Sequence, residues 1–168
     1  MDITEAILFD HFRQRQAFAR LDDVDPHDTP TLTALWGQLA TFLEAHAAAE
    51  ELVFYPELLA IAKKEVDETK DAISDHNKLR DAIADASTHA VGSAAWWKAV
   101  DKARTENTEH MGEEEDGPLR DFRQGATLQL RHDLGVRFEA AKTLAQRDSL
   151  DETDKNPSTY VKEHKPRT

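Results

Sequence analysis

The sequence predicts an all-α protein, an up-down bundle of four helices with an additional helix on the C-terminal side. Only six glycines and six prolines interrupt the 168 residues, and residues that favour helix (alanine, leucine, glutamate and lysine) fill the segments between them. No stretch alternates between apolar and polar residues as a strand does, while apolar residues recur at helical spacing. A chain of this length is the usual size of one domain.

The first two helices are separated by a segment rich in turn-forming residues. We expect the first helix over about residues 3–20, followed by a loop over 21–28 with four aspartates and a proline. Thr29 and Pro30 suit the cap and first turn of the second helix, which is expected to kink near Pro56. The loop lacks the central glycine and the twelfth-position glutamate of an EF-hand, so the pattern indicates a solvated loop and not a calcium site.

Glycine and proline also mark the boundaries of the later helices. The third helix is expected over about residues 66–89, before a break at Gly92. The fourth is expected from about residue 94 to Gly117, because Gly117 and the proline after it both oppose continuation. A fifth helical stretch is then expected over 119–146.

The C-terminal end differs from the rest of the chain in composition. We expect residues 1–146 to form the domain with all five helices. Residues 147–168 are so polar that we expect a flexible tail that adds nothing to the core. Removing this tail is therefore expected to leave metal binding intact.

Composition excludes several classes of protein. The absence of cysteine excludes disulfides, zinc–thiolate sites and iron–sulfur clusters, so any metal must be bound by nitrogen and oxygen. A formal net charge of −12 opposes binding to nucleic acid or to anionic lipid. No apolar run approaches the length of a membrane span, and the N-terminus lacks a leader pattern. These observations predict a cytoplasmic protein with no nucleic-acid or membrane partner.

Two histidine–glutamate pairs fall on the apolar faces of predicted helices. His46 and Glu50 are four residues apart, and so are His110 and Glu114, which places each pair on one side of its helix. Such a pair is usually a surface charge pair. Here each pair continues an apolar stripe, and both pairs should therefore point into the bundle. A buried carboxylate without a partner is costly, so both pairs need one.

The other two helices of the bundle each offer one histidine on the same inward side, His11 and His76. Taken alone, either would more often be a core histidine satisfied by a hydrogen bond. Four imidazoles and two carboxylates in a dry core, however, destabilise the fold unless a cation binds them. Imidazole and carboxylate suit iron, manganese or zinc, and six side chains from four helices fit two ions better than one.

The order of these residues resembles the hemerythrin (HHE cation-binding) family over roughly residues 5–118. The resemblance rests on Asp10-His11, His46-Ala-Ala-Ala-Glu50-Glu51 before Phe54-Tyr55-Pro56, Asp75-His76-Asn-Lys-Leu-Arg80, and His110-Met-Gly-Glu-Glu114. It implies a four-helix bundle with two iron ions in an oxo- or hydroxo-bridged diiron centre. By the resemblance, Glu50 and Glu114 bridge the irons, His11 and His46 bind one of them, and His76 and His110 bind the other.

The chain departs from the family pattern at one position. Hemerythrins carry a second histidine four residues before the one that matches His76, and this chain has Ala72 there. One iron should therefore keep an open position, filled by water or by the phenol of Tyr55, although Tyr55 could equally pack the bundle. Glu113 and Glu115 flank Glu114, but the spacing favours Glu114. The remaining histidines are expected at the surface: His27, His89, His132 and His164.

A diiron centre in a dry bundle binds small ligands such as O2, H2O2 or nitric oxide, and no large substrate pocket is evident from the pattern. We expect a redox enzyme or scavenger that acts on peroxide or nitric oxide, with an electron donor that the sequence does not identify. The alternatives are reversible oxygen binding for carriage or storage, and oxygen or iron sensing. A metal-free structural bundle is the third hypothesis.

Overall fold

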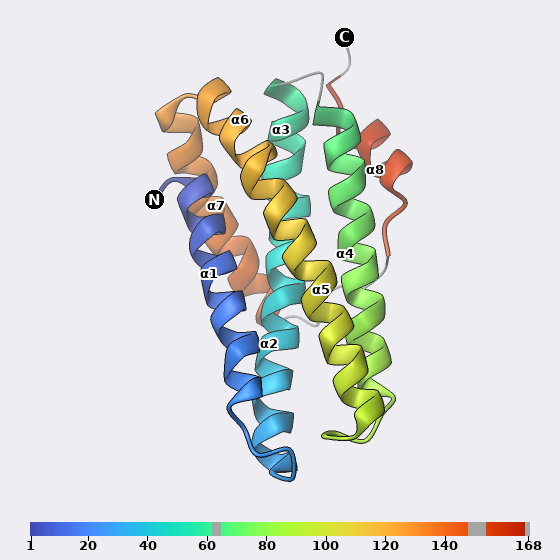
Figure 1. The fold of residues 1–168 in the computed structure, drawn as a ribbon. Helices are drawn as coiled ribbons and strands as arrows, with labels where there is room; N and C mark the ends of the chain where they lie inside the picture. The colour runs from blue at the N-terminus through green and yellow to red at the C-terminus, as the bar shows by residue number, and fades with distance from the viewer. Residues whose placement is uncertain (62–64, 148–153, 167–168) are drawn as a thin grey trace.

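The computed structural model describes residues 1–61, 65–147 and 154–166, and every regular element within these ranges is helical (Figure 1). This confirms the all-α class. The elements are α1 (Ile3–Asp22), α2 (Thr29–Ala49), the π-helical segment η1 (Glu50–Phe54), α3 (Tyr55–Ile61), α4 (Glu65–Ser87), α5 (Ala94–Asp116), α6 (Pro118–Gly125), α7 (Leu128–Arg147) and α8 (Pro157–His164). None of the described helices is long and apolar enough to cross a bilayer.

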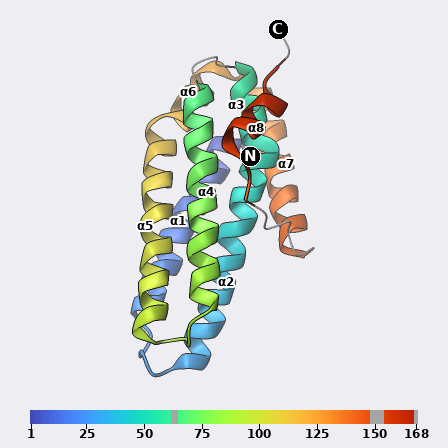
Figure 2. The ribbon, with the colours of Figure 1, turned by 90° about the vertical axis from the view of Figure 1, so that its right-hand side faces the viewer.

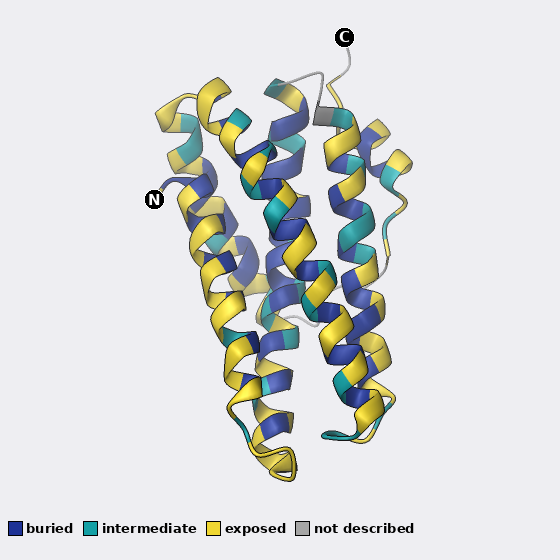
Figure 3. Ribbon diagram, in the orientation of Figure 1, coloured by how far each residue is buried: buried dark blue, intermediate teal, exposed yellow. Residues whose placement is uncertain are grey.

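Four long rods lie side by side along the molecule: α1, α2 with its continuation through η1 and α3, α4, and α5 (Figures 1 and 2). The closest partners are α4 and α5 on one side and α1 and α2 on the other. Helix α7 packs along both α1 and α2, and α8 packs on α4 and α3. The buried residues face inward on all of these helices (Figure 3).

A capping aspartate and a glycine turn explain where two of the predicted loops lie. Asp28, one residue before the expected cap, caps α2 by accepting a hydrogen bond of 3.2 Å from the backbone N–H of Thr31. Gly92 lies in the turn before α5 with a φ of 81°, and a side chain there would meet the carbonyl oxygen of Pro26 at 2.7 Å. The α1–α2 and α4–α5 turns therefore lie close together at one end of the molecule, and the absence of a side chain at Gly92 leaves room for this approach.

The core consists of two separate apolar clusters. One contains Ile7 of α1, Phe54 of η1 and Ile73 of α4, and the other contains Phe18 of α1, Leu43 of α2 and several residues of α4 and α5. On α1, on the rod of α2, η1 and α3, and on α4, the buried histidine lies between the residues of one cluster and those of the other. On α5, His110 follows residues of the second cluster, and the first cluster resumes only in α6. We call this layer of buried polar residues the polar belt.

Two expectations differ from the structure. The single fifth stretch over 119–146 is two helices, α6 and α7, because α6 ends at Gly125 and α7 begins only at Leu128. The tail over 147–168 was expected to add nothing to the core, yet α8 buries Tyr160 and Val161 to 5% exposure each in the first apolar cluster. A helix that brings one aromatic and one β-branched residue together on one face can dock even though its segment is polar overall. Part of that tail lies outside the described residues.

Candidate metal centre

The six side chains predicted to hold metal all lie in the polar belt. They come from four rods and are at most 4% exposed: His11, His46, Glu50, His76, His110 and Glu114. Their donor atoms form two compact groups, His11 with His46 and Glu50, and His76 with His110 and Glu50. In each group the donor atoms lie within 4.8 Å of one another. Glu50 is the member common to both groups.

The two oxygens of Glu50 face different histidines. Oε1 lies 2.9 Å from Nε2 of His46 and 4.0 Å from Nε2 of His11. Oε2 lies 3.3 Å from Nε2 of His76 and 3.8 Å from Nε2 of His110. One carboxylate thus presents one oxygen to each histidine pair, as a bridge between two cations requires.

Glu114 belongs to neither donor group, but it lies beside the first of them. Its Oε2 is 3.3 Å from Nε2 of His11. The Tyr55 ring lies 5.8 Å from the His76 ring. Burial raises the pKa of the Tyr55 phenol well above its usual value, and the negative charge of Glu114 raises it further. The phenol is therefore neutral in the metal-free protein. Glu113, by contrast, is exposed.

The inward-facing atoms have no hydrogen-bond partners within the described part of the chain. This holds for Nε2 of His11 and His46, both oxygens of Glu50 and of Glu114, and the hydroxyl of Tyr55. Buried polar atoms are almost always paired, because an unpaired one costs about 1–3 kcal/mol. A set of nitrogen and oxygen lone pairs that converge without partners fits a cation site, and their chemistry suits iron, manganese or zinc.

A second set of carboxylates holds the outer nitrogens of the histidines. The Nδ1 atom of His46 lies 3.2 Å from Asp10, that of His76 lies 2.8 Å from Glu51, and that of His11 lies 2.9 Å from Glu115. In the neutral imidazole, each pair favours the Nδ1 proton on the carboxylate side, which directs the Nε2 lone pair inward. Carboxylate–histidine pairs of this kind orient metal ligands in proteins.

Comparison with known proteins adds one finding to this geometry. The family model for the hemerythrin HHE cation binding domain matches residues 2–118. The chain belongs to the hemerythrin HHE cation-binding family. No curated protein and no solved structure matches the chain significantly. Every residue of the two donor groups falls within the matched region, whereas α7 and α8 of this hemerythrin HHE protein lie beyond it.

Two lysines beyond the matched region form ion pairs with the outer carboxylates. Lys142 of α7 is 6% exposed and forms an ion pair with Asp10. Lys155, just before α8, forms an ion pair with Glu51, and the hydroxyl of Tyr160 donates to the backbone oxygen of Glu51. These contacts fix two of the carboxylates that orient histidines in this hemerythrin HHE chain.

The positive groups around Glu51 lower the pKa of its carboxyl group. Burial alone raises the pKa of a carboxyl group, but the hydrogen bond from His76 and the charges of His76, Arg80 and Lys155 outweigh burial and lower the pKa of Glu51 to about 2. Arg80 donates to the same carboxylate over 2.8 Å. Glu51 is thus ionised at neutral pH.

The π-helical segment of this hemerythrin HHE domain begins at Glu50, where the backbone N–H of Tyr55 bonds to the carbonyl of Glu50. The wider turn carries Glu50, Glu51 and Tyr55 to the buried side of one rod. Such turns are common at functional sites. Near Pro56, where a kink was expected, the structure has a π turn directly before the proline.

Some site residues were not foreseen from the sequence. Asp10, Glu51 and Glu115 stand next to predicted ligands in the chain, but each of them contacts a histidine of another helix. The most distant pair in the chain is Glu115 and His11, which are 104 positions apart. No sequence signal indicated Lys142 or Lys155. Four histidines lie outside the cluster, with His27, His132 and His164 exposed and His89 half-buried beside Asp85.

Metal uptake by the apoprotein is expected to release protons. Burial disfavours charge on His46, but Glu50 and Asp10 outweigh it and raise its pKa to about 10, and neighbouring carboxylates also raise the pKa values of His11 and His76. A metal must displace these protons, so its apparent affinity should rise at least about tenfold per pH unit between pH 7 and the pKa of His46. Isothermal titration calorimetry in buffers of different ionisation enthalpy counts the protons.

The exposed His27 supplies the control, because His27→Gln should leave this proton count unchanged. Without metal, the raised pKa of His46 stabilises the fold fully below its unfolded value of 6.5, and this contribution disappears as the pH rises through about 10. Metal uptake with no proton release at pH 7 contradicts the assignment of these imidazoles as the groups that the metal displaces.

Proposed function

We propose that this protein is a non-haem diiron protein that reduces peroxide or reacts with nitric oxide, with α1, α2–α3, α4 and α5 as its up-down four-helix bundle. The observation that supports this most is the carboxylate of Glu50, shared by two histidine pairs in a dry interior. A single ion needs no such bridge. Two iron ions held there supply two one-electron redox centres, which matches a two-electron substrate such as peroxide.

In this proposal, His11 and His46 hold one iron and His76 and His110 hold the other. Glu50 and Glu114 join them, in accord with the short distance between Glu114 and His11 and the influence of Glu114 on Tyr55. The family membership supports cation binding, and the donor set suits iron. The electrons come from an external donor, and the cytoplasmic location remains a prediction from the sequence.

The unequal surroundings of the two histidine pairs favour turnover over reversible carriage. Ala72, one helical turn before His76, is 8% exposed and offers no donor atom. Beside the same histidine lies the phenol of Tyr55, which is neutral and has no hydrogen-bond partner among the described residues. The iron held by His76 and His110 therefore has room for a small ligand, and Tyr55 can donate a proton to that ligand.

Iron-reconstituted protein provides the test. We expect two irons per chain, a near-ultraviolet charge-transfer band, and consumption of peroxide or nitric oxide well above that of free iron. Ala72→His should slow this turnover by filling the open position, and Tyr55→Phe should slow it by removing the proton donor, by about 10²-fold or more. Stable, reversible oxygenation without such consumption supports a carrier instead, and one metal per chain contradicts the diiron proposal.

A further inference from the structure

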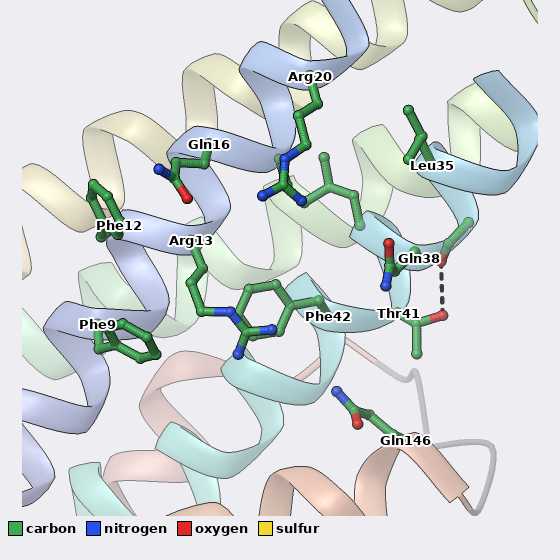
Figure 4. Close-up of a pocket in the computed structure, with 13 residues that line it drawn as sticks. Phe9, Phe12, Arg13, Gln16, Arg20, Leu35, Gln38, Thr41, Phe42 and Gln146 are labelled. Carbon is green, nitrogen blue, oxygen red and sulfur yellow. Dashed lines mark hydrogen bonds between the residues drawn. The ribbon is translucent and has the colours of Figure 1, made fainter. Parts of the chain in front are cut away.

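An open groove of about 770 Å³ runs between α1 and α2, next to the end of α7 (Figure 4). Its α1 wall carries Phe9, Phe12, Arg13 and Arg20, and Phe42 lies on the α2 wall. This volume differs from the expectation, based on the sequence pattern, that no large pocket is present. None of the candidate metal ligands lines it, so the groove is a separate site from the metal centre.

The groove offers an aromatic surface that the fold leaves uncovered. Phe9 and Phe12 are 59% and 52% exposed, which is unusual for phenylalanine in a globular protein. The guanidinium of Arg13 lies over the Phe42 ring at 4.8 Å and within 5.9 Å of the Phe9 ring (Figure 4). This stacking holds Arg13 between a ring of α1 and a ring of α2.

The charge of the groove is opposite to that of the chain. Acidic residues outnumber basic ones by 33 to 21 in the whole sequence, yet the lining contains Arg13 and Arg20 and no aspartate or glutamate. Arg13 makes only a long ion pair of 3.8 Å with Asp10. Among the described residues, the arginines of α1 that form ion pairs are Arg13 and Arg15, and Arg20 is exposed without such a pair. The groove therefore attracts an anion although the protein as a whole repels one.

We propose that this groove binds a small planar aromatic anion, a ring system that carries a carboxylate, sulfonate or phosphate group. The ring packs on Phe12 and Phe42, and the acidic group pairs with Arg20, whose planar guanidinium matches such groups well. Gln38, on the α2 wall opposite Arg20, supplies a further amide donor. The volume lies in the range of small-molecule sites, about 300–1,000 Å³.

The groove also lies next to the metal centre, because the Phe42 ring that forms its wall is 6.4 Å from the ring of His46. Binding itself, however, requires no iron. Apoprotein and iron-loaded protein should both bind the anion, so failure of the diiron proposal leaves this one standing, and failure here leaves the diiron proposal standing.

Fluorescence anisotropy of 2-naphthoate, titrated with the full-length protein at low ionic strength, tests the proposal. The neutral amide of the same ring, 2-naphthamide, should bind about tenfold more weakly, because it cannot form the charge-assisted pair with arginine. Arg20→Gln should weaken 2-naphthoate binding by a similar factor. Gln38→Glu should do the same, since it places a carboxylate opposite Arg20 without changing the size of the side chain.

Arg120→Gln is the matched control, since Arg120 is an exposed arginine of α6 outside the groove lining. It removes the same charge and should leave 2-naphthoate binding unchanged, and added salt should weaken binding to the unmodified protein. Equal affinity for 2-naphthoate and 2-naphthamide, or an equal loss of 2-naphthoate affinity in Arg20→Gln and Arg120→Gln, overturns the proposal. Binding would then reflect nonspecific apolar contact alone. Circular dichroism establishes that each variant is folded.

Discussion

Glu50→Gln is expected to empty both metal positions, whereas Glu113→Gln should leave them filled. Glu50 faces all four candidate histidines, and its two oxygens have no other hydrogen-bond partners in the described structure. The amide keeps the shape of the side chain but lacks the charge that holds cations together. Loss of one outer partner of a metal ligand already costs about 10–100-fold in affinity, so loss of a shared ligand should cost more.

Iron per chain, measured by elemental analysis after equal reconstitution, is the readout for both variants. Glu113 is the matched control because it is exposed, carries the same charge, and precedes Glu114 directly in the chain. Glu114→Gln should show an intermediate to severe loss. If Glu50→Gln and Glu113→Gln retain the same amount of iron, Glu50 is not a bridge and the diiron assignment fails.

Truncation after Arg147 is expected to destabilise the protein and weaken metal binding, contrary to the sequence-based expectation of a dispensable tail. It removes the buried side chains of Tyr160 and Val161, whose burial stabilises the fold by about 4 kcal/mol in total. It also removes the contacts of Lys155 and Tyr160 with Glu51, the carboxylate that orients His76. Metal affinity should fall by about tenfold or more.

Point variants in the full-length chain separate these two effects. Lys155→Met removes the ion pair with Glu51, while Lys162→Met changes an exposed lysine of the same C-terminal segment. We expect the first to lower metal affinity more than the second, with melting temperatures that differ little because Lys155 is 38% exposed. Denaturant unfolding gives the stability and metal titration the affinity. Unchanged values for the truncated protein restore the tail hypothesis.

The sequence was sufficient to predict features that depend on spacing within one helix. The breaks at Gly92 and Gly117 are where the structure has them, because Gly92 adopts a positive φ of 81° and a proline follows Gly117. The inward direction of His46 with Glu50, and of His110 with Glu114, followed from their place in an apolar stripe. All six predicted metal residues consequently lie together in the belt.

Features that depend on contacts between helices could not be predicted in this way. The partners of Nδ1 in His46 and His76 lie 36 and 25 residues away in the chain, and no local pattern selects them. Likewise, α8 docks through Tyr160 and Val161, two residues too few to stand out in a polar segment. The π turn at Glu50 depends on how the rod packs around the belt, whereas the sequence showed only the proline after it.

The polar belt also bears on how the two ends of the molecule communicate. Because it separates the apolar clusters along three of the four rods, we expect the hydrophobic packing at the two ends to behave as two units. Between them lie the polar side chains of the belt and the buried Ala45, Ala47 and Met111, which belong to neither cluster. In the metal-free state, buried nitrogen and oxygen atoms without hydrogen-bond partners among the described residues fill this layer, so thermal fluctuations should open the bundle at its middle before either end frays. Bound cations should stabilise the polar belt, so that the two ends of the bundle unfold together.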